Sequence, residues 1–124
     1  MVLHIHALDA IRLTTHPSLR RRNVRFYRDL LGLPLVYDEC RADLLLFRLH
    51  RRELRLEFAP CVAVNRNRWR AAFEVDDLQR LFRTLDEGGY RPRWHSGCSL
   101  ATQRIFVSDP TGYRLELLRL WPMF

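Results

Sequence analysis

The feature that most constrains how this chain can fold is an internal repeat. The segment Arg55-Leu56-Glu57-Phe58 returns as Arg114-Leu115-Glu116-Leu117, 59 positions later, and the glycines Gly32 and Gly88 are separated by a similar distance. Repetition at this period indicates two copies of one supersecondary unit, neither of which can bury the apolar face of its sheet alone. At 124 residues the chain has the ordinary size of one domain. We therefore expect a single domain whose halves, about 1–60 and 61–124, pack together.

The first half has the pattern of a strand, a helix and three further strands. Alternating residues predict a strand over 4–15. A break follows, with Ser18 as the expected helix cap, and apolar residues then recur at helical spacing until Gly32. Short runs between polar turns predict the three strands, over 34–37, 44–49 and 53–58. The helix should pack on the sheet through its apolar and aromatic residues, Phe26, Tyr27, Leu30 and Leu31.

The second half repeats this order. A strand is predicted over 68–75, and a helix begins at Asp76 or Asp77 and ends at Glu87, before a pair of glycines. Three strands then follow, over 90–94, 104–108 and 113–120. The run Asp109-Pro110-Thr111-Gly112 suits a tight turn, because proline fixes φ at the second position and glycine takes a positive φ at the fourth. The fold class is therefore α+β, with two β-α-β-β-β modules.

Cysteine usage and hydropathy exclude several classes of protein. Three cysteines without a CxxC pair, Cys40, Cys61 and Cys98, argue against a disulfide framework and against a zinc knuckle. No apolar stretch approaches the roughly 20 residues of a membrane span. The first residues are too polar for a secretory leader. We expect a soluble, cytoplasmic protein without a membrane partner.

The chain has a formal net charge of +7, and all of its 21 basic residues are arginine. Such a bias can arise from genome composition, so it does not by itself indicate a polyanionic partner. The arginine runs 20–22 and 51–52 could contact phosphates, but a solvated helix start and a hairpin turn explain them better. No RNA-recognition sheet motif or helix-turn-helix spacing accompanies them. We expect no nucleic-acid partner.

Two motifs resemble those of a known superfamily. Phe26-Tyr27-Arg28-Asp29-Leu30-Leu31-Gly32-Leu33 resembles its "FYxxxLGL" helix end, and the segment from Asp109 to Leu117 resembles its "DPxGxxxEL" hairpin. The superfamily is that of the vicinal oxygen chelate proteins, which includes glyoxalases, bleomycin-resistance proteins and extradiol dioxygenases. The likeness covers nearly the whole chain. It implies a curled mixed sheet around a small-molecule cavity.

The resemblance also implies a divalent metal bound by one residue from each of four strands. Two of these positions carry Glu57 and Glu116, but the other two fall at Leu8 and Arg70, which cannot bind a metal. Arginines two residues before each glutamate should pair with it and repel a cation, so we expect no cofactor. His4 and His6 share the face of Leu8, and a two-residue shift would make Glu57, Glu116 and His6 a metal set.

Arginine is what the concave face of such a sheet would offer instead. A guanidinium is a planar, bidentate partner for a carboxylate or a phosphate, so the face predicts a small anionic ligand. The expected binding residues are Arg12, Arg55, Arg70 and Arg114, joined by Arg104 from the neighbouring strand. An arginine–glutamate network that only fills this side of the sheet is the competing interpretation.

The same face would permit acid–base chemistry. Glu57 or Glu116 could abstract a proton next to a carbonyl while an arginine stabilises the enolate, and His95 could act as a second acid unless it is only an exposed loop residue. Whether the chain is an enzyme stays open at this point.

Our first hypothesis is a glyoxalase-like protein that binds a small anionic metabolite between its two modules, without metal. The alternative is a metal-dependent lyase, isomerase or dioxygenase of the same superfamily. A sequestering protein of the bleomycin type is disfavoured, because its large cationic ligand would call for an acidic groove. The apolar segment 117–124 also predicts a homodimer.

Overall fold

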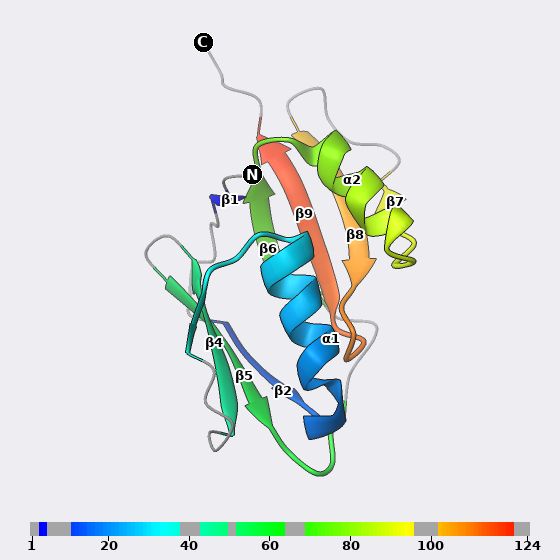
Figure 1. Cartoon of the computed structure of the whole chain (residues 1–124). Coiled ribbons are helices and arrows are strands. Elements are labelled where there is room, and N and C mark those ends of the chain that lie inside the picture. Colours follow the sequence, from blue (N-terminus) through cyan, green and yellow to red (C-terminus); the bar gives the residue numbers. More distant parts are fainter. Residues whose placement is uncertain are drawn as a thin grey trace.

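The computed structural model describes residues 3–4, 11–37, 43–49, 52–63, 69–95 and 102–120. Their strands form two open, curled sheets, one of four strands in the order β2-β5-β4-β3 and one of five in the order β1-β6-β9-β8-β7. Both sheets lie behind the helices in Figure 1. This arrangement confirms the α+β class expected from the repeat.

The first sheet contains the strands predicted for the first half. They are β2 (Ile11–Thr15), β3 (Leu35–Tyr37), β4 (Leu44–Leu49) and β5 (Arg52–Phe58). Strand β2 runs parallel to β5, whereas β4 pairs antiparallel with both β5 and β3.

The second sheet repeats this pairing pattern. Its strands are β6 (Trp69–Val75), β7 (Arg93–Trp94), β8 (Thr102–Ser108) and β9 (Arg114–Leu120). Strand β6 runs parallel to β9, and β8 pairs antiparallel with β9 and β7. The short strand β1 (Leu3–His4) adds to the outer edge of β6, so the predicted strand over 4–15 contributes to both sheets. Residues 5–10, between these two parts, lie outside the described residues.

The first helical segment has three parts, the 3₁₀ helix η1 (Pro17–Leu19), the α-helix α1 (Arg20–Val24) and the π-helix η2 (Arg25–Leu30). The expected cap at Ser18 is wrong, because the 3₁₀ turn begins at Pro17 and its cap is His16. The Nδ1 atom of His16 accepts a hydrogen bond from the Ser18 backbone N–H at 3.1 Å. Gly32 ends the segment with φ 80°, which confirms the predicted stop.

The helix α2 (Leu78–Glu87) follows the sequence more closely. The Asp77 side chain caps it by accepting from the Arg80 N–H at 3.1 Å, and the predicted glycine pair follows it. Its buried residues, Leu78, Leu81 and Leu85, lie on one face of the helix. No helix in the described ranges is long and apolar enough to cross a membrane.

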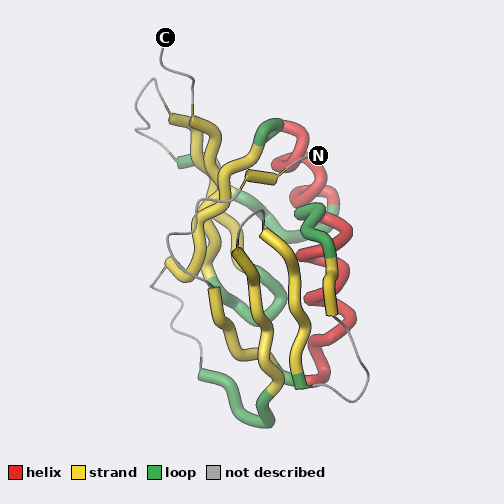
Figure 2. Tube along the Cα trace, turned by 90° about the vertical axis from the view of Figure 1, so that its left-hand side faces the viewer, coloured by secondary structure: helices red, strands yellow, loops and turns green. Residues whose placement is uncertain are grey.

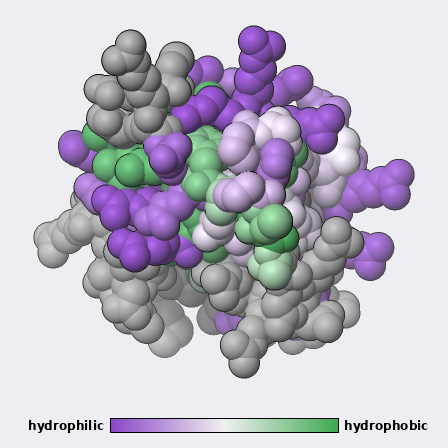
Figure 3. All heavy atoms as spheres, turned by 90° about the horizontal axis from the view of Figure 1, so that it is seen from below, coloured by the Kyte–Doolittle hydropathy of each residue, from purple (hydrophilic) through white to green (hydrophobic). Residues whose placement is uncertain are grey.

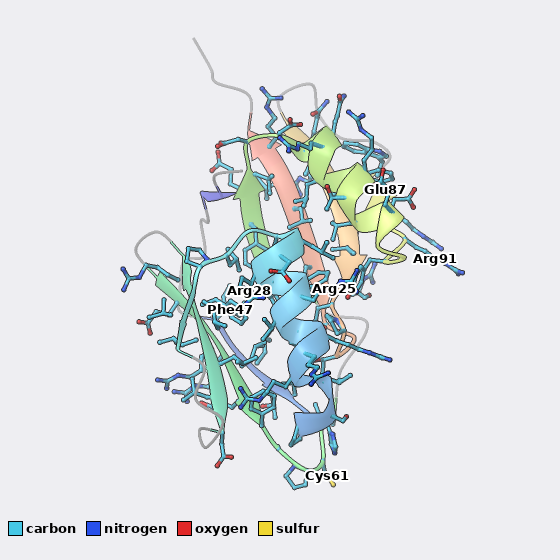
Figure 4. All side chains as sticks on the ribbon, in the orientation of Figure 1. Arg25, Arg28, Phe47, Cys61, Glu87 and Arg91 are labelled. Carbon is cyan, nitrogen blue, oxygen red and sulfur yellow. The ribbon has the colours of Figure 1, made fainter. Side chains whose placement is uncertain are left out.

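The core lies between the helices and the sheets. Phe26, Tyr27 and Leu31 are buried, as predicted, and Leu30 packs half-buried against them. The Tyr27 ring lies 5.5 Å from the Phe47 ring, which reaches from β4 toward the helical segment (Figure 4). Figure 2 shows the helices gathered on one side of the strands. At the lower end of the molecule, apolar surface is bordered by hydrophilic side chains (Figure 3).

Strand alternation places charged side chains on the other side of each sheet. In the first sheet Leu13 and Leu56 point into the core, whereas their neighbours Arg12, Arg55 and Glu57 do not. We call this the helix-free face. The predicted site residues that the structure describes lie on this face in both sheets.

Candidate functional site

On the helix-free face of the first sheet, two arginines stand directly opposite each other. The parallel register of β2 and β5 pairs Arg12 with Arg55 and Thr14 with Glu57. The Nε atom of Arg12 lies 3.2 Å from Oε1 of Glu57, and the two side chains are 66% and 40% exposed. Arg55 has no acidic side chain within ion-pair distance among the described residues. Glu57 therefore pairs with only one of the two neighbouring guanidinium groups, that of Arg12.

Two leucines of β4 lie beside these charges. Leu46 is the cross-strand neighbour of Arg55, and Leu44 is that of Glu57. Both leucines are half-buried. The face thus combines positive charge with apolar surface at its margin.

The second sheet holds its glutamate in a more enclosed setting. Oε1 of Glu116 lies 3.0 Å from Nη1 of Arg104, and only 16% of the glutamate side chain is exposed. Phe106 on β8 and Ala72 on β6 are its cross-strand neighbours. The His95 ring contacts the Phe106 ring edge-on, with centroids 5.2 Å apart, so the predicted loop histidine lies beside this glutamate's neighbour.

The predicted partner of Glu57 was wrong, because Arg12 pairs with this glutamate and Arg55 does not. Glu116 pairs with Arg104 of the neighbouring strand, and its predicted pairing with Arg114 stays a prediction. Residues two apart on one strand are separated by about 6.6 Å, whereas residues on neighbouring strands are about 5 Å apart. An arginine on a neighbouring strand can therefore reach the glutamate carboxylate more easily than an arginine two residues away on the same strand.

Several predicted residues fall partly or wholly outside the described structure. Leu8 and His6 belong to the undescribed segment 5–10, and only the backbone of Arg70 is described, within β6. His4 is described as backbone opposite Glu74. Cys61 is free and exposed in the loop after β5 (Figure 4), whereas Cys40 and Cys98 lie outside the described residues.

A buried polar network that the sequence did not predict joins the two modules. Tyr27 donates its hydroxyl hydrogen to Oδ2 of Asp109 at 2.5 Å, and the Asp109 side chain is almost fully buried. Oδ1 of Asp109 accepts hydrogen bonds from the backbone N–H groups of its own turn, Thr111, Gly112 and Tyr113. Gly112 has φ 107°, as the predicted turn requires.

Two further contacts extend this network to β2. The Tyr113 hydroxyl donates to the Thr14 carbonyl oxygen at 2.6 Å, and the Thr15 and Thr111 hydroxyls lie 2.8 Å apart. We call the set Tyr27, Asp109, Thr111, Tyr113, Thr14 and Thr15 the inter-module clasp. The clue in the sequence was that each of the two recognised motifs contributes a polar residue to it.

Burial is the largest influence on the pKa values of two groups in the clasp, the Tyr27 hydroxyl and the Asp109 carboxyl. It raises the pKa of the Tyr27 hydroxyl well above its ordinary value, and the neighbouring Asp109 carboxylate adds to the effect. Burial also raises the pKa of Asp109, although the hydrogen bonds from Tyr27 and the turn act in the opposite direction. The clasp therefore serves the fold, since a tyrosine with a raised pKa stays a hydrogen-bond donor.

The family model of the Glyoxalase/Bleomycin resistance protein/Dioxygenase superfamily matches residues 21–117. The chain belongs to this superfamily. No curated protein matches the chain in sequence. The glyoxalase superfamily thus accounts for both recognised motifs, the helix end and the hairpin.

Solved structures of this superfamily's fold superpose over most of the chain. A glyoxalase family protein from Bacillus anthracis has a TM-score of 0.76 at 18% identity, with 97% of this chain and 99% of that chain covered. A fosfomycin resistance protein from Listeria monocytogenes has a TM-score of 0.72 at 12% identity, covering 91% and 90%. An antibiotic-binding protein from a Streptomyces strain has a TM-score of 0.65 at 16% identity, covering 94% and 99%.

Members of the glyoxalase superfamily often use a divalent metal, which needs several side chains that can bind it at one place. Within the described ranges, no three histidine, cysteine, aspartate or glutamate side chains gather as metal ligands. Both candidate carboxylates, Glu57 and Glu116, already contact a guanidinium group that would repel a cation. The described residues therefore do not fit the family's metal.

Proposed function

We propose that this glyoxalase-superfamily domain binds a small anionic molecule on its helix-free face, and that Arg12 and Arg55 hold the anionic group. The observation that carries the proposal is the direct opposition of these two arginines in the β2–β5 register. Like charges directly opposite each other destabilise a sheet. A carboxylate or phosphate between them would remove that repulsion and accept bidentate hydrogen bonds.

The other charged residues fit supporting roles in this proposal. Glu57 holds Arg12 in place, and Glu116 does the same for Arg104. Arg104 and Arg114 would extend the positive face into the second sheet, and Arg70, whose side chain lies outside the described residues, stays a predicted member of the set. Since both glutamates already contact a cation, we propose binding rather than proton abstraction as their part in the function.

The apolar margin indicates the kind of molecule. Leu44 and Leu46 flank Glu57 and Arg55 on the neighbouring strand. A ligand with one anionic group and a small hydrocarbon or carbonyl body would match this combination. The solved structure of an antibiotic-binding protein with this fold supports a binding role, as an analogy of architecture alone.

Calorimetry and thermal unfolding with a panel of monocarboxylates, dicarboxylates and phosphate monoesters test the proposal. We expect one class to stabilise the protein, and we expect its affinity to fall at least about ten-fold (about 1.4 kcal/mol) in Arg55→Ala. Arg80→Ala is the matched control, because Arg80 is an exposed arginine of α2 on the helix side. Equal affinity in Arg55→Ala and the parent would contradict the proposal.

The same samples distinguish the metal-dependent alternative. Stoichiometric nickel, zinc, manganese or iron after purification without chelator, with stabilisation that a chelator reverses, would indicate a lyase, isomerase or dioxygenase. Loss of that stabilisation in Glu57→Gln and Glu116→Gln would identify the carboxylates as ligands.

We also propose a homodimer, on narrower grounds than the sequence offered. Leu117 is fully buried in the chain's own core and cannot contribute to a partner interface. Only Leu118 and the residues after it remain from the apolar segment, and 121–124 lie outside the described residues. Light scattering at micromolar concentration should give twice the mass of 14.9 kDa, and a strict monomer would remove the proposal.

A further inference from the structure

A cavity of about 280 Å³ lies on the helix side of the molecule, where the two modules meet. Segments that are far apart in the sequence build it. Its lining consists of Arg22, Arg25, Leu30, Gly88, Tyr90 and Pro110. The first three come from the helical segment of the first module, and the last three come from the end of α2 and the β8–β9 turn of the second.

Two arginines give this cavity its charge. Arg22 and Arg25 are three residues apart and therefore project from the same side of the helical segment. Arg25 lies on the side of the segment that faces the second module (Figure 4). In the described part of the chain neither arginine has an acidic side chain within ion-pair distance, and Asp29 is engaged by Arg28 at 2.8 Å. No described carboxylate therefore forms a direct ion pair with either guanidinium group.

Tyr90 adds a hydrogen-bond donor. Its ring packs against the buried Phe26 ring at a centroid distance of 4.8 Å, which fixes its position at the cavity. Its hydroxyl makes no hydrogen bond to a described residue. Burial raises the pKa of Tyr90 despite the nearby arginines, so the hydroxyl keeps its proton at neutral pH.

The buried carboxylate of Asp109 is close enough to the cavity to contribute to the raised pKa of Tyr90. Asp109 precedes the lining residue Pro110 and is only 4% exposed. Its two oxygens accept hydrogen bonds from Tyr27 and from three backbone N–H groups of the turn. These donors offset its charge, so an anion can approach the arginines from the solvent side.

We propose that this junction cavity is a second anion site, which takes a phosphate group or a small dicarboxylate. Two guanidinium groups and one phenol hydroxyl supply donors for a dianion, and Leu30 and Pro110 give the site apolar walls. The cavity admits a small ligand only, because pockets that bind drug-sized molecules usually have volumes of about 300–1,000 Å³. The junction cavity shares no residue with the helix-free face, so the test of this second site is independent of the test of the proposed function.

Nuclear magnetic resonance titration of the full chain with inorganic phosphate tests the site, at constant ionic strength against sodium chloride. We expect saturable shifts of the Gly88, Gly89 and Tyr90 amide signals. In the double variant Arg22→Ala/Arg25→Ala the affinity should fall at least ten-fold, and in Tyr90→Phe it should fall about three-fold. Malonate in place of phosphate tests the dicarboxylate arm.

Arg21→Ala is the matched control, since Arg21 is an exposed arginine of the same helix that does not line the cavity. It should leave the phosphate affinity, as read from the Gly88, Gly89 and Tyr90 signals, unchanged. Shifts that do not saturate, or that weaken equally in Arg21→Ala, would show non-specific screening and overturn the proposal. Circular dichroism of each variant confirms that a loss of binding is not a loss of fold.

Discussion

The two modules present a glutamate at the matching position of β5 and β9, but they surround it differently. Glu57 is 40% exposed and pairs with Arg12 of the first strand of its module, beside a second arginine. Glu116 is 16% exposed and pairs with Arg104 of β8, beside an aromatic ring. The repeat thus reproduces strand order and the carboxylate, while the neighbouring strands decide whether the site is open or enclosed.

This difference indicates where a ligand can act. In the open first sheet Arg55 has no ion-pair partner among the described residues, whereas in the more enclosed second sheet Arg104 pairs with the Glu116 carboxylate. We therefore expect the first module to determine affinity for an anion and the second to determine stability.

The largest expected effect comes from breaking the clasp that joins the modules. Asp109→Ala removes the acceptor of the buried Tyr27 hydroxyl and of three backbone N–H groups, of which that of Tyr113 is buried and those of Thr111 and Gly112 are part-buried. Buried donors left without an acceptor cost about 1–3 kcal/mol each when water cannot reach them, so we expect a loss of at least about 3 kcal/mol. Urea unfolding measures it. Asp86→Ala, on the exposed side of α2, should change stability by less than about 0.5 kcal/mol.

A smaller effect separates the two glutamates. Glu116→Gln should destabilise the protein by about 1 kcal/mol, because it removes the charge that faces Arg104 in an enclosed setting. Glu57→Gln should cost no more than about 0.5 kcal/mol, as expected for an exposed ion pair. Equal losses of stability in the two variants, or a larger loss in Glu57→Gln, would contradict the difference described between the two modules.

The pH dependence of the clasp is a further test. Because the folded pKa of Asp109 is raised, the folded state binds its proton more tightly than the unfolded chain does. This residue therefore stabilises the fold increasingly as pH falls from neutral through the folded pKa toward its ordinary value near 4. The stability difference between the parent and Asp109→Asn should grow in favour of the parent over that range. A difference that shrinks with falling pH would mean that the hydrogen bonds outweigh burial.

The smallest expected effect concerns the opposed arginines. Without an anion, Arg55→Gln should raise stability by a few tenths of a kcal/mol at low salt, because it removes a like charge opposite Arg12. The gain should vanish near 1 M salt, where the Debye length falls to about 3 Å. Arg114→Gln should give no such gain, because Trp69 stands opposite Arg114 in the β6–β9 register. A gain from Arg114→Gln would contradict the contrast drawn between the sheets.

Local patterns in the sequence predicted most of the fold. The strand over 44–49 and the end of α2 at Glu87 match the structure residue for residue, because periodicity and glycine stops are properties of a short segment. The turn at Asp109 was predicted for the same reason, as proline and glycine restrict φ locally. The hairpin and helix motifs also located the superfamily correctly.

The contacts that were missed all depend on how separate segments align. The choice of Arg12 over Arg55 as partner of Glu57 follows from the β2–β5 register, which the sequence does not contain. The burial of Asp109 against Tyr27 follows from the docking of one module on the other. The π-helical turn over 25–30 likewise departs from the helical spacing that the apolar residues suggested.

The pairing of β1 with the edge of β6 has a consequence for folding during translation. Leu3 pairs with Val75, so residues synthesised near the beginning find their backbone partners only after more than half of the chain has left the ribosome. Contacts over such a sequence separation form slowly, because a long loop must close first. During translation, β1 would therefore stay without its pairing strand until β6 has been synthesised. A protease pulse during synthesis should cut near β1 until β6 emerges, and protection there should arrive abruptly rather than residue by residue.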